Sequence, residues 1–343
     1  MIPTLFFYCN LIAKLRAMFN YEAQRKRSEL YRNLRRFFWE RGYLEVETPL
    51  LSPYLIPEPT IKAFSTRFES PFDGRLDLCL LPSPEYYMKQ LLADGAPSIF
   101  QITKCFRNSE QLGEVHNPEF TMLEYYTLGF DEMDTLRLTE EMLRETALGD
   151  GADWVRREPL VITMREAVLE YSGVDLLRCQ EPEEIRAEAE RLGLYVPDGE
   201  AWDDTFNRIF LTFVEPSIPK DRQVYITDYP YQIDCLAQRD GCWRKRWELY
   251  INGIEIANTY SEETDPETTA RYFEKEQRRL EKERRLTGEV ISSADPAFPA
   301  LSIPRSSGGA MGLDRLLAVM LGYDTIQPLL LFPLSDMIAR ADT

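Results

Sequence analysis

The 343-residue chain contains one histidine, and its six cysteines lie far apart without a CxxC pair. Zinc sites are built from clustered cysteine and histidine ligands, so the sequence argues against zinc. It also lacks GxGxxG and GxxxxGK[ST], the glycine-rich signatures of dinucleotide-binding and P-loop folds. Long apolar runs are missing as well, because the apolar stretch at residues 2–13 is too short to span a bilayer. We therefore expect no membrane association, and scattered thiols favour the reducing cytoplasm.

The chain has fewer basic than acidic residues. Lysine and arginine number 40 against 57 aspartates and glutamates, which gives a net charge of −17 and a pI near 4.7. Proteins that grip polyanions usually have a basic surface, so a large nucleic-acid interface is disfavoured. Basic triplets occur at residues 25–27 and 244–246, but such clusters are more often solvated faces than binding sites.

Apolar periodicity and turn residues predict a series of helices and strands. Gly42 is expected to end the first helix, and Ser83 is expected to cap the second. The turn Asn252-Gly253 predicts a tight hairpin. Helices are predicted over residues 21–41, 86–93, 266–286 and the stretch ending at 321, and strands over residues 43–46, 98–107, 119–129, 247–251 and 254–258.

Several antiparallel pairs surrounded by helices predict an α+β fold, with an antiparallel sheet flanked by helices, rather than a doubly wound parallel sheet. Residues 130–220 are acidic and mostly helical by pattern, which indicates an insertion in a domain spanning residues 21–343. Residues 1–20 are interpreted as an N-terminal extension of uncertain role, either a short appended helix or a stretch before a start at Met18.

The strand that begins at Glu119 carries an unusual combination of side chains. Strand side chains alternate with period two, so Phe120, Met122, Glu124 and Tyr126 should share one face. Buried carboxylates are rare unless they are paired, so Glu124, flanked by the apolar Met122 and Leu123, calls for a cationic partner. The alternative is an edge strand with Glu124 in water.

The predicted hairpin brings two glutamates together. A two-residue turn pairs Tyr250 with Glu255 and places Glu248 beside Ala257. Glu248 and Glu255 then lie on one face as diagonal neighbours, where like charges repel unless a cation lies between them. Oxygen ligands of this kind suit Mg²⁺ or Mn²⁺. The alternative is a solvated hairpin with two unrelated glutamates.

Three more charged residues are candidates for the same site. Glu262 follows Glu255 by seven residues but has the opposite parity, so a bulge near Asn258-Thr259 would be needed to turn it inward. Arg107 ends a predicted strand, and Arg315 follows the glycine-rich run 308–312. Arginine suits contact with phosphate or stacking on adenine, and glycine permits close approach to a ligand.

These pieces together resemble class II aminoacyl-tRNA synthetases. Residues 106–124 resemble motif 2 in its lysyl form, 42–49 motif 1 (the dimer element), 312–315 motif 3, and 252–258 the lysyl-type metal hairpin. Lysyl-tRNA synthetases carry an anticodon-binding barrel before motif 1, whereas only about 40 residues precede Gly42. That layout resembles the elongation factor P lysine ligase family, whose members attach β-lysine to a lysine of the factor. Thr259 replaces a glycine of the lysyl pattern and would be strained at positive φ.

The resemblance implies a role for each matching residue. Arg107 and Arg315 would be catalytic, with Arg107 between the substrate carboxylate and the α-phosphate. Glu248 and Glu255 would hold Mg²⁺. ATP would be bound by Arg107, Glu110, His116, Asn117, Phe120, Glu255, Ile256, Gly312 and Arg315. The amino-acid substrate would be bound by Ser83, Glu85, Glu124, Tyr126, Asn258, Tyr260, Glu262 and Ala310.

The activity implied is that of an ATP-dependent ligase, which forms a lysyl or β-lysyl adenylate and transfers the acyl group to a lysine of elongation factor P. Ala310 stands where the synthetases have glycine and the ligases have alanine, and its methyl would crowd an α-amino group. The implied state is a homodimer, with tRNA disfavoured as a partner. The alternatives are a minimal lysyl-tRNA synthetase and a non-catalytic paralogue that binds lysine or a partner.

Overall fold

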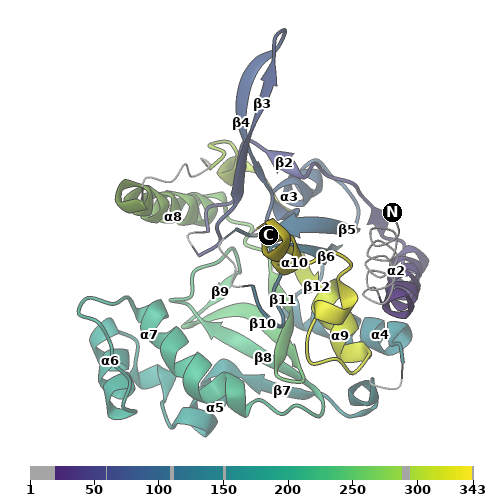
Figure 1. Ribbon diagram of the computed structural model, residues 1–343. Helices are drawn as coiled ribbons and strands as arrows, with labels where there is room; N and C mark the ends of the chain where they lie inside the picture. Colours follow the sequence, from purple (N-terminus) through teal and green to yellow (C-terminus); the bar gives the residue numbers. More distant parts are fainter. Residues whose placement is uncertain (1–19, 59, 109–111, 150–151, 288–293, 342–343) are drawn as a thin grey trace, which may run out of the picture.

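A mixed sheet forms the centre of the molecule. The computed structural model describes residues 20–341 apart from 59, 109–111, 150–151 and 288–293. Within these residues the main path of the sheet is β1-β5-β6-β12-β11-β10-β8-β7, with β9 paired to β10 (Figure 1). Its strands are β1 (Leu44–Glu45), β5 (Ile99–Phe106), β6 (Glu119–Leu128), β7 (Leu160–Thr163), β8 (Gln223–Pro230), β9 (Arg239–Asp240), β10 (Trp243–Ile251), β11 (Ile254–Ser261) and β12 (Ser306–Gly312).

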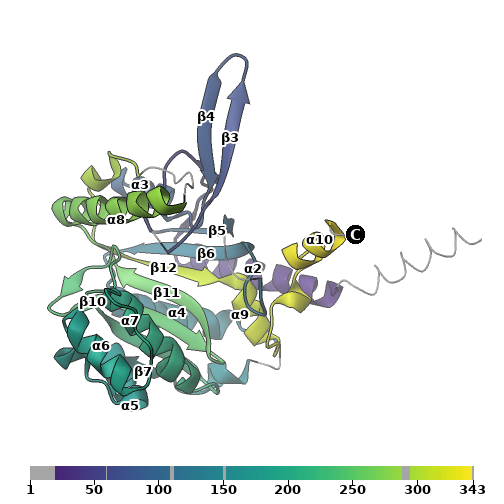
Figure 2. The ribbon, with the colours of Figure 1, turned by 60° about the vertical axis from the view of Figure 1, so that its left-hand side comes forward.

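The predicted α+β fold is confirmed. Every pairing along the sheet is antiparallel except at its two ends, where β1 pairs with β5 and β7 pairs with β8 in parallel. A smaller sheet follows the order β2-β4-β3, with β2 at Leu51–Ser52, β3 at Phe64–Ser70 and β4 at Gly74–Leu80. The β3–β4 hairpin extends away from the body of the molecule, and Phe72 at its tip is 94% exposed (Figure 2).

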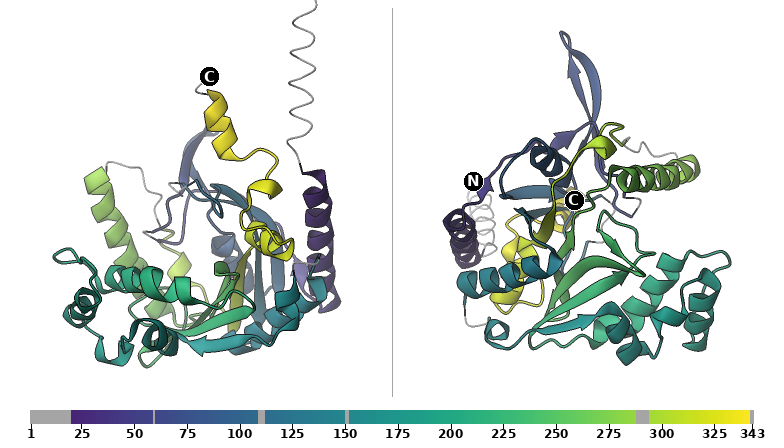
Figure 3. Two further views of the ribbon diagram at one scale, coloured as in Figure 1. Left: turned by 60° about the horizontal axis from the view of Figure 1, so that its bottom comes forward. Right: turned by 180° about the vertical axis from the view of Figure 1, so that it is seen from behind.

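Helices cover one face of the sheet. They are α2 (Tyr21–Glu40), α4 (Glu132–Thr146) and α9 (Leu313–Met320), which lie together in the views of Figure 3. Their apolar stripes pack on alternate strand residues such as Leu123, Tyr125, Trp247 and Leu249, all 0–1% exposed. Because strand side chains alternate, the opposite face of the same strands is left to carry Glu124 and its neighbours.

Two further groups of helices complete the fold. Helices α5 (Met164–Ser172), α6 (Pro182–Arg191) and α7 (Trp202–Ile209) form a second core against β7 and β8. Helices α3 (Glu85–Ala93) and α8 (Pro266–Thr287) contribute Tyr86 and Phe273 to a small cluster on another side. Helix α10 (Leu334–Ala341) follows α9 near the end of the chain. None of the helices described has both the length and the apolar character needed to cross a membrane.

The predicted helices and strands are largely confirmed, with two corrections. Gly42 follows α2 with a φ of +78°, as expected of a residue that ends a helix. Ser83, however, is not the N-cap of α3: Pro84 occupies that position, and Ser83 accepts the backbone N–H of Glu85 at 3.0 Å. The glycine-rich run before Arg315 is strand β12 in the middle of the sheet. Close packing leaves no space for a side chain at Gly308 and Gly309, where a Cβ would lie 2.4 Å and 2.6 Å from the nearest atoms.

The register of the β10–β11 hairpin also differs from the prediction. Tyr250 pairs with Glu255 as expected, but Glu248 pairs with Asn258 and not with Ala257, because a bulge adds Ile256 to β11. The bulge lies earlier than the predicted position near Asn258-Thr259. It reverses the side-chain phase of β11 and so turns the later even-numbered residues toward the face of Glu255. Thr259 keeps ordinary strand backbone, since only Asp228 and Asn252 have positive φ among the described non-glycine residues.

Candidate active site

A cavity of about 530 Å³ lies on the face of the sheet that the helices α2, α4 and α9 leave uncovered. All but two of the predicted site residues line it. The exceptions are Glu248, which is buried beside the cavity with 9% exposure, and Glu110, which lies outside the described residues. The predicted residues that line it are Ser83, Glu85, Arg107, His116, Asn117, Phe120, Glu124, Tyr126, Glu255, Ile256, Asn258, Tyr260, Glu262, Ala310, Gly312 and Arg315.

Strand register places these residues in rows across the sheet. One row runs Glu248, Asn258, Ala310, Glu124 and Gln101 across β10, β11, β12, β6 and β5. Directly paired residues project to the same face of a sheet. The predicted alternation along β6 is therefore confirmed, and the neighbouring strands add their polar residues to the same side.

A second row lies next to the first. It runs Arg246, Tyr260, Gly308, Tyr126 and Ile99 across the same five strands. Gly308 is required in this row because a Cβ there would lie 2.4 Å from the ring of Tyr126 and 2.5 Å from the carboxylate of Glu262. The missing side chain leaves room for the polar groups on either side of it.

Glu124 forms the polar floor at one end of the cavity. Ser83 donates to its Oε2 at 2.6 Å, and Tyr126 donates to its Oε1 at 2.8 Å. Burial, with the nearby charge of Glu85, raises the pKa of Glu124 to about 8, although both hydrogen bonds oppose the shift. Glu124 is 2% exposed in an interior strand, so the alternative of an edge strand with Glu124 in water is wrong. Within the described residues its carboxylate has no ion-pair partner.

Lys89 is a member of the site that the sequence analysis missed. Its Nζ lies 2.5 Å from Oε1 of Glu85 and 2.7 Å from Oε2 of Glu262. The hydroxyl of Tyr260 donates to the same Glu85 oxygen at 2.7 Å. Burial alone would lower the pKa of Lys89, but the charges of Glu262 and Glu85 outweigh it and raise that pKa. Glu262 thus already has a cationic partner within the chain. The four-residue spacing of Glu85 and Lys89 on one helix face was the available signal.

Arginines gather at the other end of the cavity. The guanidinium of Arg107 lies 5.3 Å from the ring centroid of Phe120. Arg315 donates to the carbonyl oxygens of Val115 at 3.1 Å and Glu255 at 3.0 Å, and it contacts His116 Nε2 at 2.6 Å. Two guanidiniums and an aromatic ring in one cavity form a suitable surface for a nucleotide and its phosphates.

Two polar residues fix the segments that carry these groups. Asn117 donates to the carbonyl of Glu119 at 2.6 Å and accepts from the backbone of Leu334 at 3.2 Å, which ties the end of the motif 2 loop to α10. Asp314, next to Arg315, accepts from Arg27 at 2.6 Å and from the backbone of Thr121 at 2.7 Å. The start of α9 is thereby held against β6.

The two hairpin glutamates lie close together beside the nucleotide end. Burial, followed by the charge of Glu248, raises the pKa of Glu255 to about 7. Glu248 accepts from Arg246 at 2.5 Å and from Tyr250 at 2.7 Å. The alternative of a solvated hairpin is wrong for Glu248, which is buried. A repulsive carboxylate pair with free lone pairs fits a divalent cation in its donor set.

The basic triplet at residues 244–246 is not the solvated face that its charge suggested. Rather than standing on a solvated face, Arg246 lines the cavity and donates to Asn258 at 3.0 Å, while Arg244 is 9% exposed and pairs with Asp234 at 2.6 Å. Arg246 precedes Glu248 by two residues in a strand, and that spacing would have placed it on the same face.

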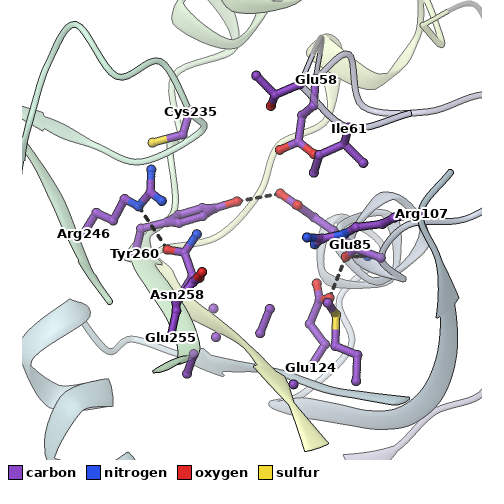
Figure 4. Close-up of a pocket in the computed structure, with 18 of the residues that line it drawn as sticks. Glu58, Ile61, Glu85, Arg107, Glu124, Cys235, Arg246, Glu255, Asn258 and Tyr260 are labelled. Atoms are coloured by element: carbon purple, nitrogen blue, oxygen red, sulfur yellow. Dashed lines mark hydrogen bonds between the residues drawn. The ribbon is translucent and has the colours of Figure 1, made fainter. Parts of the chain in front are cut away.

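Several further lining residues of the cavity were not predicted from the sequence. They include Glu58, between β2 and β3, and Cys235, between β8 and β9. In Figure 4 the Tyr260–Glu85 hydrogen bond crosses the cavity, with Glu124 and Glu255 on one side of it and Glu58 and Cys235 on the other. No motif or periodicity marks these loop positions in the sequence.

Comparisons with known proteins relate the chain to one family. Residues 8–336 match the class II (D, K and N) tRNA synthetases. The chain is 34% identical over 317 residues to the elongation factor P–(R)-β-lysine ligase of Hamiltonella defensa, covering 90% of this chain and 94% of that protein. It is 35% identical over 311 residues to the enzyme of that name from Histophilus somni strain 2336 (89% and 93% covered) and 34% identical over 317 residues to that of Proteus mirabilis (90% and 94%).

Proposed function

The chain belongs to the class II (D, K and N) tRNA synthetase family, and from this premise we propose that it is a ligase that activates a lysine-type amino acid with ATP. The acyl group then passes to a lysine side chain of elongation factor P, the substrate that the names of its relatives state. We also place this reaction in the cytoplasm, where translation factors act.

The observation that carries the proposal is the polarity of the cavity. At one end Glu124 is buried with two hydrogen-bond donors and without an ion pair among the described residues. At the other end Arg107, Phe120 and Arg315 line the wall. A substrate with an ammonium at one end and a reacting carboxylate at the other matches this arrangement. Binding would supply the cation that Glu124 lacks, and the carboxylate would lie toward the guanidiniums.

Activation needs no general base, because the attacking carboxylate is already ionised at pH 7. The chain contributes position and charge: Arg107 orients the carboxylate and the α-phosphate, and Arg315 stabilises charge on the phosphates as pyrophosphate departs. Glu248 and Glu255 would hold Mg²⁺, which supplies further charge neutralisation when bound. We further propose that the adenine of ATP stacks between Phe120 and Arg315, two of the residues expected to bind ATP.

The donor that we favour is β-lysine. Ala310 lies in the row between Glu124 and Asn258, so its methyl group faces the substrate. Glu85 has one carboxylate oxygen bound to Lys89 and Tyr260, and its second oxygen would remain for the substrate's other amino group. The relatives' names state (R)-β-lysine.

A homodimer formed through the region of residues 42–49 is part of the proposal. Leu44 in this region and Leu50 and Leu51 directly after it expose 50%, 37% and 43% of their surface. Adjacent exposed leucines are typical of an interface between protein chains. Sedimentation velocity of the full chain should give twice the monomer mass.

The decisive experiment tests whether elongation factor P or tRNA accepts the acyl group. Full-length protein is incubated with ATP, Mg²⁺ and labelled α- or β-lysine, together with elongation factor P or tRNA. We expect lysine-dependent pyrophosphate exchange, a preference for β-lysine, and label on the factor. Label on tRNA would instead identify a minimal lysyl-tRNA synthetase, and lysine binding without exchange would identify a non-catalytic paralogue.

A further inference from the structure

Transfer of the acyl group to the acceptor lysine, the second step of the proposed reaction, requires a group that accepts a proton from that lysine. A lysine side chain has a pKa near 10.4, so only about one amine in a thousand is neutral at pH 7. The ammonium form has no lone pair with which to attack an acyl carbon. A base within the cavity that accepts this proton would raise the rate, typically by about 10²- to 10⁴-fold.

Most carboxylates that line the cavity are already engaged. Lys89 pairs with Glu85 and Glu262, and Ser83 and Tyr126 donate to Glu124. Glu255 lies 3.7 Å from Arg315. The other engaged carboxylates are Asp203 and Glu276, both paired with Arg279, Asp234 with Arg244, and Asp314 with Arg27. A carboxylate fixed by a guanidinium is a poor base because the cation stabilises its charged form.

Glu58 differs from all of these. It lines the cavity, yet among the described residues its carboxylate makes no hydrogen bond or ion pair. Figure 4 places it on the same wall as Arg107 and Glu85, across from Arg246 and Cys235. Burial, then the charge of Glu85, raises the pKa of Glu58 to about 7, against the lowering effects of Arg107, Lys89 and Arg246. The other ionisable group facing it is Tyr272 of α8.

The position of Glu58 also suits an acceptor. The cavity lining also includes Asp203 and Asn207 of α7 and Tyr272 and Glu276 of α8, none of which belongs to the residues assigned to ATP or the amino acid, and the charge of Glu58 acts on Tyr272. Glu124 lies on the other side of the Tyr260–Glu85 hydrogen bond, where the donor's ammonium would sit. The donor and the acceptor would therefore approach the acyl carbon from opposite sides.

We propose that Glu58 is the base that removes a proton from the acceptor lysine before its nitrogen attacks the acyl-adenylate, an inference that rests on the proposed function. The ammonium gives one proton to the Glu58 carboxylate, and the neutral nitrogen forms a bond to the acyl carbon. The bond from that carbon to the phosphate oxygen breaks, and AMP leaves with the electron pair. The nitrogen releases its second proton to water and becomes the amide N–H, and Glu58 later gives its own proton to water, which restores the carboxylate.

Single-turnover transfer by the Glu58→Gln variant tests this role. Wild-type and variant proteins are first loaded with lysyl-adenylate and then mixed with elongation factor P. We expect pyrophosphate exchange within about 2-fold of wild type and transfer at pH 7 slower by about 100-fold. The deficit should narrow toward pH 10, where the acceptor amine loses its proton in solution. Glu58→Asp should restore part of the rate.

Two controls distinguish the outcomes. Hydroxylamine, an amine that is neutral at pH 7, should attack the adenylate equally fast in both proteins, which a merely structural role would not predict. Asp240→Asn, an exposed carboxylate of β9 that does not line the cavity, should transfer at the wild-type rate. Equal transfer by Glu58→Gln at pH 7, or loss of its lysine-dependent exchange, would overturn the assignment. A wild-type protein without exchange would instead overturn the proposed function.

Discussion

Lys89 and Glu262 form an ion pair of 2.7 Å in which each side chain is 1% exposed. The pair joins α3 to the segment that follows β11, and Glu85 contacts the same ammonium from the other side. Two of the carboxylates predicted to bind substrate are therefore held by a cation of the protein itself. This leaves Glu124 as the buried carboxylate that most needs an external one.

Removal of Lys89 should destabilise the protein strongly. Lys89→Met leaves Glu85 and Glu262 buried without a cation, which is expected to lower the free energy of unfolding by about 3–5 kcal/mol. Urea denaturation at pH 8 measures the loss. Lys104→Met removes an exposed partner of Glu119 and should change stability by no more than about 1 kcal/mol. If the two variants lose the same amount, the buried pair has no special role.

The stability of the ligand-free protein should depend on pH through Glu124. Its pKa is raised to about 8, so its contribution to stability is complete below the unfolded-state pKa, near 4.3, and is lost as the pH rises through about 8. Glu124→Gln should therefore be more stable than wild type at pH 8, by on the order of 1 kcal/mol or more, and equal to it near pH 4. Thermal unfolding at both pH values checks this, and Glu119→Gln, exposed on the same strand, should show no such difference.

Glu255→Gln should separate activity from folding. Loss of this carboxylate removes half of the proposed cation site and also the like-charge repulsion with Glu248, so the fold should persist while lysine-dependent pyrophosphate exchange falls by at least about 100-fold. Asp240→Asn on β9, exposed beside the hairpin, is the matched control. Unchanged exchange in the Glu255→Gln protein would remove the metal assignment.

Gly308 and Gly312 offer a matched pair of substitutions in one strand. A Cβ at Gly308 would lie 2.4 Å from Tyr126 and 2.5 Å from Glu262, whereas at Gly312 the nearest atoms are 3.9 Å away. Gly308→Ala should lower the free energy of unfolding by about 1–3 kcal/mol, and Gly312→Ala should change it by about 0.5 kcal/mol or less. Equal denaturation midpoints would show that the row at Gly308 adjusts without cost.

Strand alternation and turn residues correctly predicted those features of the site that depend on only a few neighbouring residues. Alternation along β6 placed Phe120, Glu124 and Tyr126 on one face, and the register across the sheet shows why: β6 is an interior strand with one apolar face and one polar face. The turn at Asn252-Gly253 likewise predicted the pairing of Tyr250 with Glu255. Each of these inferences needs only a few neighbouring residues.

The rest of the site depends on contacts between distant segments. The partner of Lys89 at Glu262 is 173 positions away, and Glu58 belongs to a loop that no periodicity describes. The register of the hairpin failed for a different reason, since a bulge is set by how both strands fit their outer neighbours. The spacing of residues along the sequence does not show how two strands pack against the strands on either side of them.

The extra residue at Ile256 decides which half of β11 reaches the cavity. If the bulge were ironed out with the chain length unchanged, Ile256 would pair with Leu249 and Ala257 with Glu248, and Asn258, Tyr260 and Glu262 would point to the helix-covered side although every one of them is still encoded. Deletion of Ile256 would instead keep Glu248 opposite Asn258 and leave these three side chains on the cavity face. A local change of pairing that alters no residue would thus remove three side chains from the cavity at once.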